Sequence, residues 1–158
     1  MAKKLLYFSI VIIFLLESCT VAKLSSLPKS SNNIDFDKCL GTIEKPSGKL
    51  RTSKTLNEYC FEKTKVYTED EMIKAIDKAI KLSGYSIINF SKTEKVVLAD
   101  RGLRANEWNS FVGIYYRIDE QTGKTKVYIQ VRITQDFTGG WNENRAQKIG
   151  SIIEKELF

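Results

Sequence analysis

The chain contains no histidine, which limits the chemistry that its side chains can perform. Histidine is the commonest general base and proton shuttle of enzymes, and it is also the commonest metal ligand. Catalysis by a serine–histidine or cysteine–histidine pair is therefore excluded. The three cysteines are too few for a structural zinc site without histidine, because such a site takes four ligands. We expect no metal and no cofactor, and we predict that the protein is not an enzyme.

Carboxylates are the side chains that could still catalyse a reaction. A glycosidase needs two of them about 5–10 Å apart across a cleft, and no spacing in this chain argues for such a pair. A small hydrolase is therefore the least favoured function. The carboxylates expected near strand ends are Asp100, Glu107, Asp119, Glu120 and Asp136.

Six side chains on two predicted strands could instead bind a ligand. Residues 110–118 and 125–135 alternate in polarity, and a loop with Gly123 joins them as in a hairpin. If Tyr116 pairs with Val127, aromatic and arginine side chains come together on the less apolar face. Such a face could stack on sugars or bases and hold anions. This Tyr/Arg face consists of Phe111, Tyr115, Arg117, Tyr128, Gln130 and Arg132.

Other interpretations of the Tyr/Arg face remain open. Its side chains could form cross-strand pairs that stabilise an exposed sheet, or residues 35–67 could pack over it. A second candidate surface lies in two loops, where Trp108 and Trp141 could contact a partner or a glycan. Alternatively, both tryptophans close the ends of the core.

Two helices are expected on the apolar side of these strands. Thr68 and Glu71 form a capping box, and the apolar spacing that follows predicts a helix over 69–83, which Gly84 ends. Asn142 is the expected N-cap of a final helix. The inner face of that helix carries Ala146, Ile149, Ile153 and Leu157.

The segments between the helices complete an antiparallel sheet. Residues 85–90 and 95–100 have strand character and precede the two stronger strands. The sequence therefore predicts an α+β core domain over 68–158 with the order α-β-β-β-β-α, a four-stranded meander with both helices on one face. Residues 35–67 are expected to be irregular or short-stranded. The candidate short strands there are 40–44 and 59–67.

The first residues of the chain indicate export. Two lysines precede a run over 5–16 that is apolar except for Ser9. This layout is typical of a secretory signal peptide, because the run is shorter than the roughly 20 residues of a transmembrane helix. The sequence Leu16-Glu17-Ser18-Cys19 that follows resembles the lipobox of bacterial lipoproteins.

The resemblance implies that residues 1–18 are removed and that Cys19 becomes the lipidated first residue, with palmitate-like acyl chains. Residues 19–34, rich in serine and asparagine, are then the anchor and a flexible tether. In Gram-negative lipoproteins, an aspartate after the lipidated cysteine retains the protein at the inner membrane. Thr20 stands at that position, so the resemblance implies the outer membrane if the organism is Gram-negative, with a periplasmic or surface-facing domain. An ordinary signal peptide with a chance cysteine, or an uncleaved short anchor, is the alternative.

With Cys19 lipidated, Cys39 and Cys60 remain as an even pair in an oxidising compartment, where such pairs form disulfides. This bond would staple residues 35–67, which have few apolar side chains to bury. Two free or buried thiols are the alternative.

Charge and location together narrow the partners. Removing the leader takes away two lysines and one glutamate, so the formal net charge changes from +6 to +5. This modest positive charge favours anionic partners, and export argues against nucleic acid among them. We predict a non-catalytic envelope lipoprotein that binds the membrane through its lipid and another envelope protein through its domain. The element order is similar to that of small helix-and-sheet modules in envelope lipoproteins. The alternative is a module that binds an anionic envelope polymer or lipid through the Tyr/Arg face.

Overall fold

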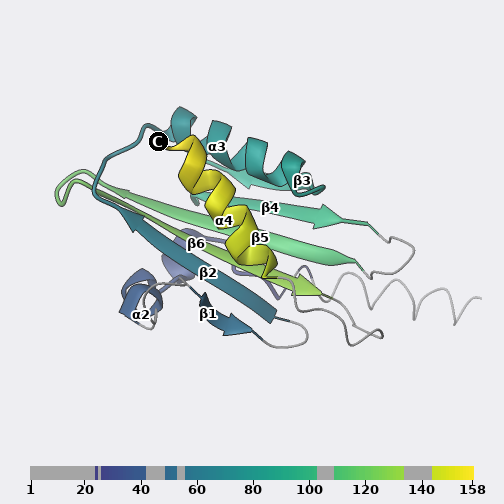
Figure 1. The fold of residues 1–158 in the computed structure, drawn as a ribbon. Coiled ribbons are helices and arrows are strands. Elements are labelled where there is room, and N and C mark those ends of the chain that lie inside the picture. Colours follow the sequence, from purple (N-terminus) through teal and green to yellow (C-terminus); the bar gives the residue numbers. More distant parts are fainter. Residues whose placement is uncertain (1–23, 25, 42–48, 53–55, 103–108, 134–143) are drawn as a thin grey trace, which may run out of the picture.

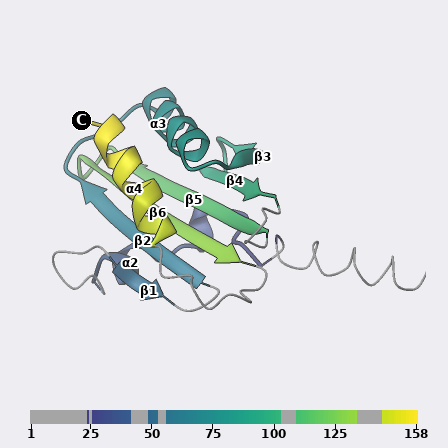
Figure 2. The same cartoon turned by 45° about the vertical axis from the view of Figure 1, so that its right-hand side comes forward.

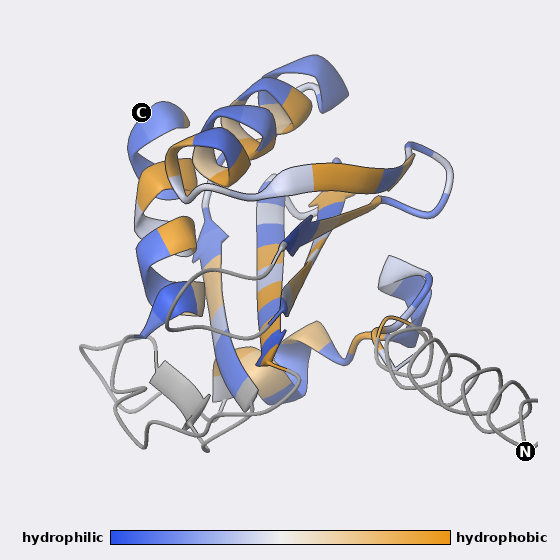
Figure 3. Ribbon diagram, turned by 90° about the vertical axis from the view of Figure 1, so that its right-hand side faces the viewer, coloured by the Kyte–Doolittle hydropathy of each residue, from blue (hydrophilic) through white to orange (hydrophobic). Residues whose placement is uncertain are grey.

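The computed structural model describes residue 24 and residues 26–41, 49–52, 56–102, 109–133 and 144–158. A single antiparallel sheet lies between two helices and the N-terminal part of the described chain (Figures 1 and 3). In chain order, the elements are η1 (Ser31–Asn33), α2 (Phe36–Gly41), β1 (Lys49–Thr52), β2 (Leu56–Lys63), α3 (Glu69–Leu82), β3 (Ser86–Ser91), β4 (Val96–Arg101), β5 (Ser110–Asp119), β6 (Lys124–Ile133) and α4 (Arg145–Glu156).

The strands of the described sheet follow the order β1-β2-β6-β5-β4-β3, and each neighbouring pair is antiparallel. The α+β class and the antiparallel sheet are confirmed, and β3 to β6 form the expected meander. The prediction of only four strands is wrong, because β2 adds a fifth strand on the outer side of β6. The four-residue β1 extends that same edge.

The fifth strand, β2, lies in the segment that was expected to be irregular or short-stranded. It pairs with β6 from Leu56 opposite Arg132 to Lys63 opposite Thr125. Apolar side chains on both faces of β2 are buried: Tyr59 faces the helices, and Cys60 faces the other side. Such a strand shows no apolar–polar alternation because both of its faces are covered. Residues 40 and 41, expected to begin a short strand, instead end α2.

Both long helices pack on one face of the sheet, as predicted, and α4 crosses it obliquely (Figures 1 and 2). At the start of α3, the Thr68 side chain accepts a hydrogen bond from the Glu71 amide, and the Glu71 carboxylate accepts one from the Thr68 amide at 2.8 Å. The predicted capping box is therefore confirmed. Gly84, with φ of 75°, follows the end of α3. The N-cap of α4 is Asn144, and Asn142 lies outside the described residues.

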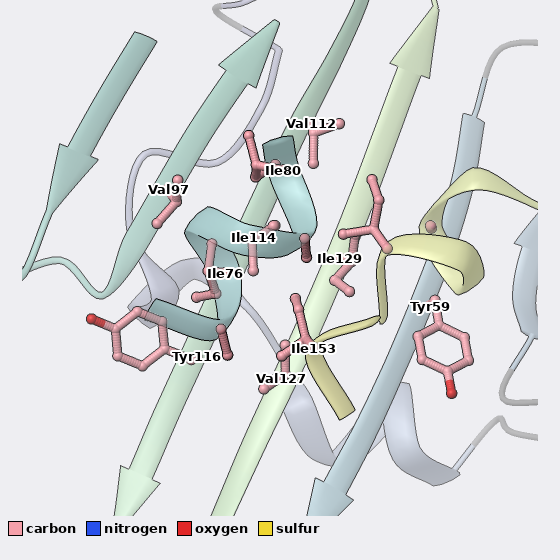
Figure 4. Packing of buried hydrophobic residues seen from close by; sticks show 14 of the residues in the cluster. Tyr59, Ile76, Ile80, Val97, Val112, Ile114, Tyr116, Val127, Ile129 and Ile153 are labelled. Carbon is pink, nitrogen blue, oxygen red and sulfur yellow. The ribbon is translucent and has the colours of Figure 1, made fainter. Parts of the chain in front are cut away.

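The larger core lies between these helices and the sheet (Figure 4). Ile76 of α3 and Ile153 of α4 are fully buried over the sheet, above Ile114 and the apolar side chains of β6. Gly150 lets α4 approach β2 closely, because a Cβ at this position would overlap the ring of Tyr59. We call this cluster the helix-side core.

The opposite face of the sheet is covered by residue 24 and residues 26–41, which we call the N-terminal cover. Leu27 and Phe36 are buried there against the sheet. The predicted disulfide is present and joins Cys39 of α2 to Cys60 of β2. Residues 26–34 were expected to form a flexible tether, but they pack on the sheet. Leu27 and the nearby Phe36 hold them there, because they are apolar side chains within an otherwise polar sequence.

Candidate binding surfaces

The Tyr/Arg face forms in the predicted register but lies inside the protein. Tyr115 is opposite Tyr128, and Phe111 is opposite Arg132. The N-terminal cover packs over this face, so the expectation of an open binding face is wrong. The alternative interpretation, a covered sheet, is observed. Residues 35–67 were expected to cover it, whereas the observed cover already begins at residue 24. The buried members of the face are Phe111, Tyr115, Tyr128 and Gln130.

The polar ends of the two tyrosines are used within the structure. The Tyr115 hydroxyl donates a hydrogen bond to the Pro28 carbonyl oxygen at 2.8 Å, and burial raises the pKa of Tyr115. The Tyr128 hydroxyl donates to the Glu58 carboxylate, which also accepts a hydrogen bond from the Gln130 amide nitrogen at 3.3 Å. Burial, followed by this carboxylate, raises the pKa of Tyr128. Both hydroxyls are therefore structural donors.

Cations at one end of this face hold α2 in place. The exposed Arg117 guanidinium lies 4.9 Å from the ring centroid of Phe36, which it contacts as a cation–π pair. Lys126 forms an ion pair with Asp37, and its hydrogen bond lowers the pKa of that carboxyl. Arg132 is half-buried. The aromatic side chains of this face are therefore covered, and binding of an anionic polymer through Arg117 and Arg132 stays a prediction.

Two of the carboxylates predicted near strand ends, Asp100 and Asp119, lie far apart along the sheet. Asp100 pairs with Phe111, which lies eight residues along β5 from Asp119. At about 3.4 Å per residue, the two carboxylates are about 27 Å apart along the sheet. Within the described ranges, no group of three or more cysteine, aspartate or glutamate side chains could hold a metal ion. Outside the described residues lie Cys19, Glu107, Trp108, Asp136 and Trp141.

The outer edge of β3 is an exposed apolar surface that the sequence analysis missed. β3 pairs only with β4, so its outer backbone N–H and C=O groups have no strand partner in the described part of the chain. Ile87, Ile88 and Phe90 are 42, 43 and 40% exposed. Figure 3 shows this apolar stretch beneath α3. The strand contains no charged residue and no proline.

A β-bulge at Ile88 arranges the side chains of this edge. Ile87 pairs with Ala99 and Phe90 with Val97, and both partners belong to the helix-side core. Residues three apart in a regular strand point to opposite faces, but the extra residue of the bulge returns both side chains to one face. Ile87 and Phe90 therefore form an apolar ledge on the α3 side of the sheet.

The signal for this edge was present in the element order. The first strand of a meander has a neighbour on one side only, unless another segment pairs with it. β2 pairs at the opposite edge, beside β6, and leaves β3 open. Two consecutive isoleucines in such a strand cannot both face the core of the sheet.

A third surface is a groove of about 750 Å³ between α3 and α4, which we call the helix groove. Its apolar part includes Leu82, which is 65% exposed, and the partly buried Ile152. The charged residues that line it are Lys78, Lys148, Lys155 and Glu156.

No described helix is both long enough and apolar enough to cross a membrane. Comparison with models of known protein families and with curated proteins finds no match to this chain. The three surfaces are therefore interpreted from their own geometry and chemistry.

Proposed function

We propose that the protein is a non-catalytic lipoprotein of the bacterial cell envelope, anchored through Cys19, and that it binds another envelope protein along β3. The observation that carries the binding half is the free edge of β3 with its three exposed apolar side chains. An extended segment that adds to a sheet edge gains affinity from backbone hydrogen bonds and specificity from the side chains that it meets.

The chemistry of β3 defines the segment that would bind. Proteins protect free sheet edges with charged residues, proline, β-bulges or a covering element. β3 has no charged residue and no proline, and its bulge at Ile88 is the one such device in the strand. The incoming segment would pair along the free edge from Ile87, past the bulge, to Ser91. Its side chains on the α3 side would rest on Ile87 and Phe90, so we expect apolar residues at alternate positions.

The position of the N-terminal cover supports a close attachment to the membrane. Leu24, the first described residue, is five positions after Cys19. Five residues span at most about 17 Å. Because the cover is fixed to β2 by the Cys39–Cys60 bond, a lipid on Cys19 would hold the domain near the bilayer surface. The intact mass of membrane-extracted protein tests the anchor: we expect residues 19–158 plus acyl chains, and an unlipidated mass contradicts it.

The binding half is tested in cells with a photoreactive phenylalanine analogue in place of Phe90. A matched analogue replaces Asn32, which is exposed on η1, on the other side of the sheet. We expect one defined protein to crosslink from position 90 and not from position 32. That protein, once purified, should bind the unmodified domain and lose affinity for an Ile88→Lys variant, whereas Asn32→Lys should bind normally.

Three outcomes contradict this proposal. Crosslinking that is equal at positions 90 and 32 would indicate nonspecific proximity in the membrane. Adducts that contain only this chain would indicate self-association. Normal partner binding by a folded Ile88→Lys variant would place the partner elsewhere. Because Ile88 is exposed at an edge, the substitution should leave the melting temperature almost unchanged.

A further inference from the structure

The helix groove combines an apolar floor with an excess of positive charge. Leu82 projects from the last turn of α3 and is 65% exposed, although α3 otherwise buries its apolar face. Ile152 of α4 lines the same groove and is partly buried against the helix-side core. An amphipathic helix binds by laying its apolar face into an apolar groove, and Leu82 and Ile152 supply the apolar part of this one.

The charges of the groove are only partly neutralised within the protein. Lys78 forms an ion pair with Glu156 at 2.7 Å. Lys148 and Lys155 are exposed, and neither forms an ion pair with another described residue. The two lysines are seven positions apart on α4, which corresponds to about 10.5 Å along the helix axis. They therefore form a pair of cations on one side of the groove, about two turns apart.

The direction in which the groove faces argues for a protein partner rather than the anchoring bilayer. The N-terminal cover and the helix pair lie on opposite faces of the sheet (Figure 3). This step rests on the proposed anchor at Cys19, whose short link to Leu24 keeps the covered face near the membrane. The helix groove then points away from that bilayer, towards other proteins.

We propose that the helix groove binds an acidic amphipathic helix of a partner protein. The bound helix lies along α4 and places aliphatic side chains over Leu82 and Ile152. Carboxylates seven positions apart on the bound helix, two turns of the same rise, face Lys148 and Lys155. The helix groove is separate from the free edge of β3. One partner can therefore contact both surfaces, or a different partner can bind at each.

Two synthetic peptides test the proposal. Both have leucine at positions i, i+3, i+4 and i+7 of an amphipathic helix; one carries glutamate at its polar positions, and its twin carries lysine. Every described helix and strand lies downstream of residue 23, so the chain from Thr20 contains the whole described fold, and its melting curve is recorded as a check. We expect the glutamate peptide to bind in fluorescence anisotropy, with affinity that falls as salt rises.

Charge reversal identifies the site. The double variant Lys148→Glu/Lys155→Glu should weaken glutamate-peptide binding by about tenfold or more, because it replaces two attractive contacts by repulsive ones. The matched control Lys29→Glu/Lys38→Glu changes two exposed lysines of the N-terminal cover and should bind like the unmodified chain. Ile88→Lys should also bind normally, which separates this proposal from binding at β3.

Two results overturn the proposal. One is equal binding of the glutamate and lysine peptides, or of the charge-reversed variant and the unmodified chain. The other is that neither peptide binds. In that case, binding to vesicles of phosphatidylcholine and phosphatidylglycerol is measured for the unmodified chain and for the variant changed at Lys148. Vesicle binding that depends on Lys148 would assign the groove to an anionic membrane. An unlipidated mass would contradict the proposed anchor at Cys19. It would not change what the peptide experiment says about the helix groove.

Discussion

Substitution of Gly113 by alanine tests whether Tyr115 positions the N-terminal cover. Gly113 lies two residues before Tyr115 on β5, on the covered face of the sheet. The tyrosine ring lies over the glycine, and its hydroxyl reaches the carbonyl oxygen of Pro28 in the cover. A Cβ at position 113 would lie 2.8 Å from both Cε2 and Cζ of that ring, which is closer than real Cβ contacts. The ring would therefore have to move and release Pro28.

The expected cost has three parts. Overpacking costs about 1–3 kcal/mol. The buried Tyr115 hydroxyl and the partly buried Pro28 carbonyl, left without their hydrogen bond, cost about 1–3 kcal/mol more. Replacing glycine by alanine within a strand returns about 0.5–1 kcal/mol. We expect Gly113→Ala to lower the free energy of unfolding by about 3 kcal/mol.

A double-mutant cycle isolates the cause. In Tyr115→Leu, the ring atoms that would meet the new Cβ are absent, so adding Gly113→Ala should be neutral or stabilising by about 0.5–1 kcal/mol. Gly102→Ala is the control, because a Cβ there has no neighbour within 4 Å. Urea unfolding of the four proteins of the cycle and the control gives these values. An equal cost of Gly113→Ala in both backgrounds would refute the role assigned to Tyr115.

Two further measurements probe the disulfide and the buried tyrosines. Cys39→Ala/Cys60→Ala opens a loop with a sequence separation of 21, and we expect a loss of about 3 kcal/mol in urea unfolding; a loss under about 1 kcal/mol would contradict this. Burial, together with the Glu154 carboxylate, raises the pKa of Tyr59 to about 12 from its ordinary value of 10.0. The folded state therefore favours neutral Tyr59, a contribution that is complete below pH 10.0 and lost as the pH rises towards 12. Melting temperatures should consequently fall less over this range in Tyr59→Phe than in the unmodified chain, and equal slopes would contradict the assignment.

Local signals predicted the helices and the central hairpin because their causes lie within a few residues. The cap at Thr68 needs only Glu71, three positions away. The hairpin register follows from period-two alternation, since a shift by one residue would move Val127 and its neighbours to the wrong face. The Cys39–Cys60 bond was predictable from the cysteine count and the expected compartment.

The position of the N-terminal cover and the burial of the Tyr/Arg face depend on contacts between residues far apart in the sequence, so local patterns did not predict them. The N-terminal cover is polar in composition, and its position depends on Leu27 and Phe36 finding a surface that is formed much later in the chain. That surface resembled a solvated face because tyrosine and glutamine are polar. A single acceptor, such as the Pro28 carbonyl oxygen, satisfies a tyrosine hydroxyl and allows its ring to be buried.

The path from the N-terminus to the sheet also determines how the domain responds to mechanical load. Tension applied ahead of Leu24 acts first on the contacts of Leu27 and Phe36, which can peel from the sheet one after another. Peeling stops at Cys39, because the covalent bond to Cys60 transfers the force directly to β2. β2 in turn pairs with β6 along its whole length. The disulfide is thus a mechanical stop: the cover can yield under strain while the sheet stays covalently joined to Cys39.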